Sequence, residues 1–231
     1  PCLSSPRMRS NASPFRPSIG QASIPSIAAV VRNEPRAMYT CRADQAIELR
    51  LPFVQRRRPC ITRHAIERTQ IDAHTDLRDE YEGTEYSHAS VMARVLGRVD
   101  IVSVGIRALT SEERELVRSR DDVTMFLADE IHGRHDWIDE VVGALGDDVY
   151  ITFDVDALDP SLVPTTGTPE PGGLDWYDSI RLLRKVFERR NVLGADVVEL
   201  APSPGQPAPE FLIAKLVYKM IGYRFAPGSM R

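Results

Sequence analysis

The sequence has few cysteines and no long apolar run, and each absence excludes a class of protein. Its three cysteines, Cys2, Cys41 and Cys60, are an odd number without metal-site spacing, so we expect no disulfide framework. No apolar run approaches the roughly 20 residues that span a bilayer. The start lacks the charged, apolar and small-residue order of a secretory signal. We therefore expect a cytoplasmic protein that does not bind membranes.

Acidic residues are scarce in the first part of the chain. Residues 1–70 contain twelve arginines, no lysine and four acids, a net charge of +8, which leaves −12 for the rest of a chain of net charge −4. Such a basic segment can bind nucleic acid, and an arginine- and serine-rich, acid-poor start can be a transit peptide. Aromatic interleaving and a nucleic-acid motif are both missing. We therefore expect no nucleic-acid partner.

The same N-terminal part also lacks a regular apolar pattern. Residues 1–36 are rich in proline, serine and arginine and read as irregular chain. A short helix over 43–49 is the one element that this region suggests, and 61–70 fits either a short helix or a weak strand. We expect an irregular N-terminal segment over residues 1–70 and an α/β domain over 71–231.

From residue 71 onward, helical and strand patterns alternate. This alternation predicts a mostly parallel sheet covered by helices on both faces. In Thr110-Ser-Glu-Glu113, a threonine three residues before a glutamate is a capping box that starts a helix. The expected helices cover 87–96, 110–118, 136–145, 174–190 and 208–223, and the expected strands cover 100–106, 123–127, 149–153 and 191–200.

Two carboxylates stand where a buried strand should end. The apolar run Val149–Phe153 reads as that strand, and Asp154 and Asp156 follow it. Parallel sheets bind ligands outside the carboxyl ends of their strands. Alternate side chains of an extended segment point the same way, so both acids could face one cation. A solvated acidic turn is the alternative reading.

A second group of potential ligands alternates over five residues. Asp72, His74 and Asp76 place a histidine between two acids at every second position. Carboxylates with one imidazole suit a fairly hard divalent ion such as Mn²⁺. A lone histidine is more often an ordinary surface or core residue, but the two motifs together favour a metal site.

These motifs resemble those of the ureohydrolases, the arginase and agmatinase family. DAHTD (72–76) and FDVDALDP (153–160) are similar to two signature motifs of the family. DLRDEYEGTEYSHASVM (76–92) and TGTPEPGGL (166–174) are closer to the agmatinase branch. The resemblance extends from about residue 71 to 223. It implies a three-layer α/β/α fold and hydrolysis of a guanidino group, as in the conversion of agmatine and water to putrescine and urea.

The resemblance also implies roles for particular residues. Two Mn²⁺ ions would be held by five ligands: Asp72 and Asp154 match the bridging carboxylates, His74 and Asp156 match ligands of one ion, and Asp76 matches a ligand of the other. Glu199 matches the acid that binds the substrate guanidinium, and Thr168 a residue that supports this acid. His88 matches a proton-shuttling histidine. We therefore expect Glu199 and His88 to be catalytic, with Glu199 and Thr168 binding the substrate.

One family motif is absent. A Gly-Gly-Asp-His sequence, which supplies the second ion's histidine, occurs nowhere in the chain. The family's N-terminal strands are also expected to be missing or altered. The resemblance therefore implies a single bound ion and weakened activity, or a non-catalytic, polyamine-binding or regulatory subunit. A phosphatase with Asp154 as nucleophile is disfavoured by Leu158, where such enzymes carry Thr or Val. A small cationic guanidino substrate and a homo-oligomer are the expected partners.

Overall fold

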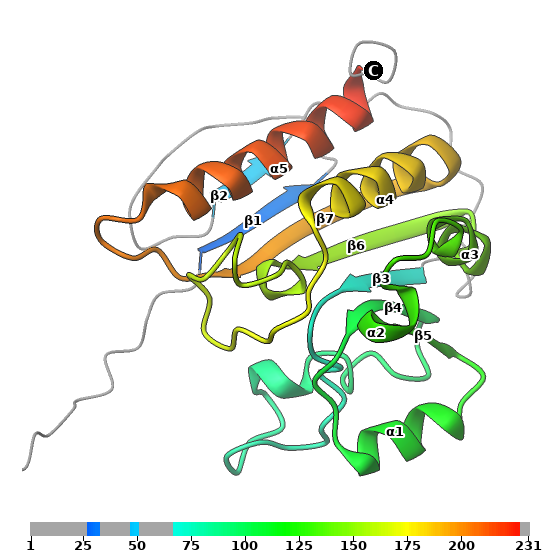
Figure 1. The fold of residues 1–231 in the computed structure, drawn as a ribbon. Coiled ribbons are helices and arrows are strands. Elements are labelled where there is room, and N and C mark those ends of the chain that lie inside the picture. Colours follow the sequence, from blue (N-terminus) through cyan, green and yellow to red (C-terminus); the bar gives the residue numbers. More distant parts are fainter. Residues whose placement is uncertain (1–26, 33–46, 51–66, 227–231) are drawn as a thin grey trace, which may run out of the picture.

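The fold is an α/β sandwich built on one seven-stranded sheet (Figure 1). The structure, a computed structural model, describes residues 27–32, 47–50 and 67–226. Expectations about the rest of residues 1–66 lie outside the described part of the chain, so the division at residue 70 stays a prediction. Among the described helices, none is long and apolar enough to cross a membrane.

The sheet has the strand order β2-β1-β7-β6-β3-β4-β5. All neighbouring pairs are parallel except β1 with β7, which confirms the expected mostly parallel sheet. The strands are β1 (Ile27–Arg32), β2 (Ile47–Arg50), β3 (Glu67–Ile71), β4 (Ile101–Ile106), β5 (Val123–Leu127), β6 (Asp148–Asp154) and β7 (Asn191–Leu200). β2 occupies part of the range expected to be helical, and β1 lies within the stretch expected to be irregular.

Helices cover both faces of the sheet. The helices are α1 (Ser111–Arg118), α2 (Ala128–Ile131), α3 (Trp137–Ala144), α4 (Trp176–Arg189) and α5 (Pro207–Phe225), with 3₁₀ helices η1 (His88–Ser90) and η2 (Val155–Ala157). Side chains of α2 to α5 share the large core with β3, β4, β6 and β7. Figure 1 shows α3, α4 and α5 side by side along that face. A smaller core on the opposite face joins α1 to β4 and β5.

The capping box expected at Thr110 is present. The Thr110 side chain accepts a hydrogen bond from the Glu113 amide at 3.2 Å, and the Glu113 carboxylate accepts one from the Thr110 amide at 2.7 Å. Two of the helix's otherwise unpaired amides are satisfied in this way. The start of α1, which packs against the smaller core, is therefore fixed by side chains of its own first turn.

The helix expected over 87–96 is not formed. Only η1 is helical there, and turns follow it. The amides of Met92 and Ala93 donate to the Asp76 carbonyl at 3.0 and 3.1 Å, while the Ala89 carbonyl accepts from the Arg78 amide. The Met92 and Ala93 amides are thereby withdrawn from the i to i−4 bonds of an α-helix, although the Arg94 and Leu96 amides still donate to the Ser90 and Met92 carbonyls. The loop of the Asp72–Asp76 motif is fastened to this segment instead.

Candidate metal centre

The two acidic motifs meet at one edge of the sheet. β3 and β6 are parallel neighbours with Ile71 opposite Phe153, so the residues that follow both strands emerge side by side. Asp72 follows β3 directly, and Asp154 is the last residue of β6. The carboxyl end of a parallel sheet is where ligands bind in such folds. The sheet thus brings together motifs that are about 80 residues apart in sequence.

Three side chains form the centre of this edge. Asp72, His74 and Asp156 each offer a ligand atom within 4.8 Å of the others. His74 Nδ1 lies 3.0 Å from Asp156 Oδ2 and 3.6 Å from Asp72 Oδ1. Both acids are buried, and His74 is partly exposed. Within residues 67–226, this is the one group of three or more potential metal ligands.

The backbone reaches this arrangement differently from the expected alternation of extended residues. The chain turns into η2 directly after Asp154, and Asp154 Oδ1 accepts a hydrogen bond from the Asp156 amide at 2.9 Å. Asp72 Oδ1 likewise accepts from the His74 amide at 2.6 Å. Each first acid therefore caps the turn that carries the second ligand. The alternation pointed to these residues, but capped turns bring them together.

Burial and crowding of negative charge perturb the acids. Burial raises the pKa of Asp72 to about 6, and burial followed by the nearby Asp72 charge raises the pKa of Asp76 to about 8. The pKa of buried Asp154 is also well above its usual value. Burial alone would raise the pKa of Asp156, but its hydrogen bond with His74 lowers it below the usual value. Three acids that resist ionisation together indicate a place for a cation.

His74 carries the compensating charge when no metal is bound. Hydrogen bonds to Asp156 and Asp72 raise the pKa of His74 to about 10. The donors present fit a divalent ion, because carboxylate oxygens with one imidazole nitrogen suit ions such as Mn²⁺. The 3.0 Å between His74 Nδ1 and Asp156 Oδ2 is the hydrogen bond that a bound ion would replace.

Asp76 and Glu199 lie at the border of this centre. The charges of Asp72, Asp156 and Glu199 all raise the pKa of Asp76, so these acids share one electrostatic environment. Asp76 has φ +54° and Glu199 has φ +63°, a left-handed backbone that is rare for residues with side chains. Such conformations cluster at functional sites. Both acids are therefore held in place by the surrounding chain against their own backbone preference.

The 165–168 loop joins β7 to the acids. Thr166 is bridged to Leu200, and the Ala201 amide donates to the Thr165 carbonyl at 2.9 Å. A Cβ added at Gly167 would lie 3.9 Å from Glu199 Oε2, so the loop backbone runs beside this carboxylate. Thr168 Oγ1 donates to Asp156 Oδ2 at 3.3 Å. The Thr168 hydroxyl thus contacts an acid of the cluster, whereas the resemblance had linked it to Glu199.

His88 belongs to a separate, exposed part of the site region. It opens η1, and its ring meets Tyr81 edge-on with the ring centroids 5.4 Å apart. Tyr81 in turn lies under the Arg78 guanidinium, 4.9 Å from ring centroid to Arg78 Cζ. The exposed position of His88 is compatible with proton exchange with water. No described contact joins His88 to the metal ligands.

Three residues that support the ligands were not predicted from the sequence. Gln70 is fully buried on β3 and donates to Asp72 Oδ2 and to the His74 carbonyl, both at 3.0 Å. Ser103 donates to Gln70 Oε1 at 2.8 Å. Arg107, after β4, donates to several backbone carbonyls. A polar residue inside an apolar strand pattern was the one signal available for Gln70 and Ser103.

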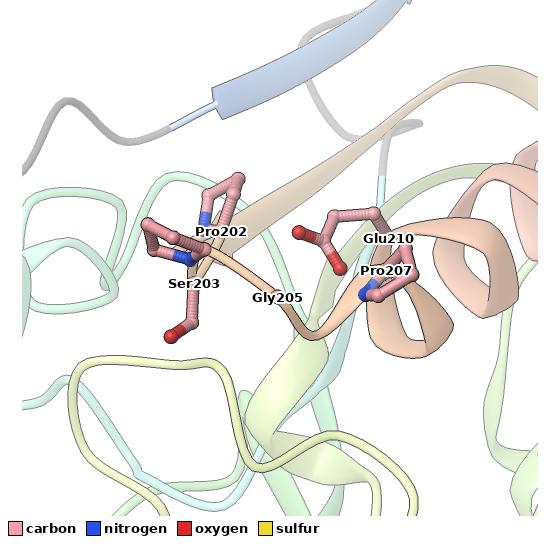
Figure 2. A pocket seen from close by; sticks show the side chains of 6 residues that line it. Pro202, Ser203, Gly205, Pro207 and Glu210 are labelled. Atoms are coloured by element: carbon pink, nitrogen blue, oxygen red, sulfur yellow. The ribbon is translucent and has the colours of Figure 1, made fainter.

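A surface hollow of about 490 Å³ lies beyond the end of β7. Figure 2 shows the Glu210 carboxylate at the start of α5 directed toward the loop that holds Pro202, Ser203 and Gly205. Oε2 of Glu210 is buried without a hydrogen-bond partner among the described residues. This loop begins three residues after Glu199, so the hollow adjoins the segment that carries this acid.

Comparison with known proteins agrees with the geometry. The model of the arginase family matches residues 60–222. An N(1)-aminopropylagmatine ureohydrolase from Thermus thermophilus is 44% identical over 174 residues, 75% of this chain and 58% of the relative. One from Synechocystis is 42% identical over 67% of this chain and 51% of the relative. The agmatine ureohydrolase structure of Thermoplasma volcanium superposes with a TM-score of 0.61 at 32% identity, over 69% of this chain and 55% of that one. The chain thus spans little more than half the length of these relatives.

Proposed function

The chain belongs to the arginase family, and from this premise we propose that it is a ureohydrolase that releases urea from a small cationic guanidino substrate of the agmatine type. The observation that carries the proposal is the buried group of Asp72, His74 and Asp156 at the carboxyl edge of the sheet. A non-catalytic regulatory or polyamine-binding subunit of the same fold is the second candidate. It is favoured by the absent Gly-Gly-Asp-His motif.

The three grouped side chains would hold a divalent ion, for which we propose Mn²⁺. When bound, such an ion would lower the pKa of a water molecule and so provide a nucleophile near neutral pH. Asp72, His74 and Asp156 supply two oxygens and one nitrogen for it. His74 must first lose its proton, because an imidazolium cannot bind a metal. Asp154 and Asp76 would complete the acidic environment of a second ion.

Two further residues would act on the substrate. The Glu199 carboxylate would accept hydrogen bonds from the guanidinium, whose planar donors match a carboxylate. The 165–168 loop lies against Glu199 and reaches Asp156 through Thr168, and would hold the guanidinium binder beside the ligand group. His88 would exchange the proton that the departing amine requires, since an exposed imidazole can both accept and donate a proton.

Agmatine and its aminopropyl derivative are the substrates to compare. The relatives from Thermus thermophilus and Synechocystis are named for N(1)-aminopropylagmatine, and one from Pyrococcus horikoshii, 36% identical over 65% of this chain, is named agmatinase. Both compounds carry a guanidinium and a distant amine. With agmatine the products are putrescine and urea, which would place the protein in polyamine metabolism and putrescine biosynthesis. We also propose a cytoplasmic homo-oligomer.

Urea release is the direct test. The full chain, stripped with chelator and reloaded with Mn²⁺, should release urea from agmatine or N(1)-aminopropylagmatine. Asp154→Ala and Asp156→Ala should lose both metal and activity, while Asp129→Ala and Asp139→Ala, which alter acids outside both motifs, should keep both. Metal binding without urea release from either substrate would favour the non-catalytic subunit. Equal metal retention in all four variants would refute the metal centre.

A further inference from the structure

Arg107 connects every loop that carries a candidate ligand. It lies just beyond β4, and its backbone amide, like that of Ala108, donates to the Ala73 carbonyl at 2.9 Å. Ala73 stands between Asp72 and His74. The backbone of residues 107 and 108 therefore fixes the first ligand loop from one side.

The Arg107 side chain reaches the other two loops. Nη2 donates to the carbonyl of Asp156 at 2.6 Å and to that of Glu170 at 2.7 Å. Nε donates to the Pro171 carbonyl at 2.9 Å. One planar guanidinium thus joins the loop of the ligand Asp156 to the loop that follows Thr168. Because Thr168 itself donates to Asp156, these contacts close a ring around this acid.

The chemistry of this contact is specific to arginine. A guanidinium offers five donors in a rigid plane, whereas a lysine ammonium offers three donors from a single point. Arg107 uses two nitrogens of that plane, Nε and Nη2, to reach carbonyls on two separate loops. Burial lowers the pKa of Arg107, and the charges of nearby acids, Asp156 and Glu170 first among them, act in the opposite direction. The same group therefore ties the loops and offsets part of their negative charge.

We infer that Arg107 is a positioning residue of the metal centre, which sets the placement of Asp156 relative to Asp72 and His74 by clamping three loops together. This inference rests on the proposed function, because it requires that the centre bind a metal. Arg107 touches neither substrate nor ion in this role. Replacing Arg107 should therefore change metal affinity and coordination more than it changes the stability of the fold.

The test compares two partly buried arginines that both donate to backbone carbonyls. Arg190 also donates to a backbone carbonyl, that of Val142 at 2.5 Å, but at the far end of α4 from the ligands. In the full chain, Arg107→Lys should weaken Mn²⁺ binding at least about tenfold by calorimetry, as losses of outer-shell partners commonly do. Arg190→Lys should leave the affinity unchanged. With Co²⁺ in place of Mn²⁺, the visible absorption bands should change in Arg107→Lys and not in Arg190→Lys.

An unchanged Mn²⁺ affinity and Co²⁺ spectrum in Arg107→Lys would overturn the inference, as would equal losses in both variants. If Arg107→Lys does not fold, hydrogen exchange of the unaltered protein, measured with and without Mn²⁺, tests the inference instead. Mn²⁺ should then slow exchange of the amides over 172–174 as well as at 72–74, and a response limited to 72–74 would overturn the inference. Urea release is measured separately. A wild-type protein that binds Mn²⁺ but releases no urea refutes the proposed activity without touching the role of Arg107.

Discussion

At the scale of single residues, the centre depends on side chains that bind no ligand themselves. Gln70 has no exposed surface, and its amide nitrogen is shared between Asp72 Oδ2 and the carbonyls of His74 and Thr75. Ser103 fixes the other end of the amide. Such partners of metal ligands orient the ligands and tune their basicity. Replacing Gln70 should therefore show how much metal affinity depends on the orientation of the ligands, because the ligand residues themselves stay unchanged.

Gln70→Leu should weaken Mn²⁺ binding by about 10- to 100-fold, because Asp72 would lose the donor to its Oδ2 and keep only the His74 amide on Oδ1. The same change should lower the free energy of unfolding by about 1–3 kcal/mol, since buried acceptors would lose a partner. Calorimetric titration and urea denaturation measure the two effects. Thr69→Val is the matched control, because the Thr69 hydroxyl is buried on the same strand with no partner among the described residues. Equal Mn²⁺ affinities for the two variants would contradict the role of Gln70.

The sequence predicted the ligand residues better than their arrangement. Asp72, His74 and Asp156 were found by spacing, but the turns that unite them depend on hydrogen bonds between side chains and backbone, as from the His74 amide to Asp72. Spacing carries no information about such bonds. Arg107 could not be identified either, because the carbonyls it joins belong to loops about 50 and 64 residues away.

At the scale of secondary-structure elements, elements governed by local signals agreed with expectation. α1 formed where a capping box predicted it, and β6 formed where apolar and β-branched residues predicted a buried strand. The segment after Ser87 did not become the expected helix, because the Asp76 carbonyl accepts the amides of Met92 and Ala93. Tertiary hydrogen bonds can override helical periodicity, and they come here from the ligand loop itself.

Thr110→Ala tests how much the capping box of α1 contributes to stability. The substitution removes the acceptor for the Glu113 amide and should reduce the free energy of unfolding by about 1 kcal/mol. Urea denaturation measures it, with the exposed neighbour Ser111→Ala as a control that should cost less than about 0.5 kcal/mol. Mn²⁺ affinity should not change in either variant. A loss of affinity in Thr110→Ala would show that the smaller core also supports the metal centre.

At the scale of the whole molecule, the perturbed groups link stability to pH. Asp72, Asp76 and His74 all have pKa values above the usual 3.8 and 6.5, so the folded, metal-free protein holds their protons more tightly than the unfolded chain does. The stability from each group is complete below its usual pKa and is lost as pH rises through the raised value. Losses should therefore accumulate from about pH 4 to pH 10.

Thermal unfolding with chelator should consequently show a melting temperature that falls between pH 5 and pH 9. Saturating Mn²⁺ should raise the melting temperature most at alkaline pH. There the ligand groups have already lost their protons, so the ion binds without having to displace them. Asp156 has a lowered pKa and should matter only in acid, where stability falls as it gains a proton. A metal-free melting temperature that rises from pH 6 to pH 9 would contradict these assignments.

The left-handed backbone at Glu199 bears on engineering of this protein. Glycine adopts φ near +63° without steric cost, so Glu199→Gly should unfold at a higher urea concentration than Glu199→Ala. Neither variant should release urea from a substrate that the unaltered protein hydrolyses, because the carboxylate proposed to bind the guanidinium is gone.

Any programme that selects variants for thermal tolerance alone would therefore drift toward glycine or asparagine at 199, and at Asp76 for the same reason. Residues with an unfavourable backbone conformation are the ones that selection for stability replaces first. A library for such a screen should therefore keep Asp76 and Glu199 unchanged.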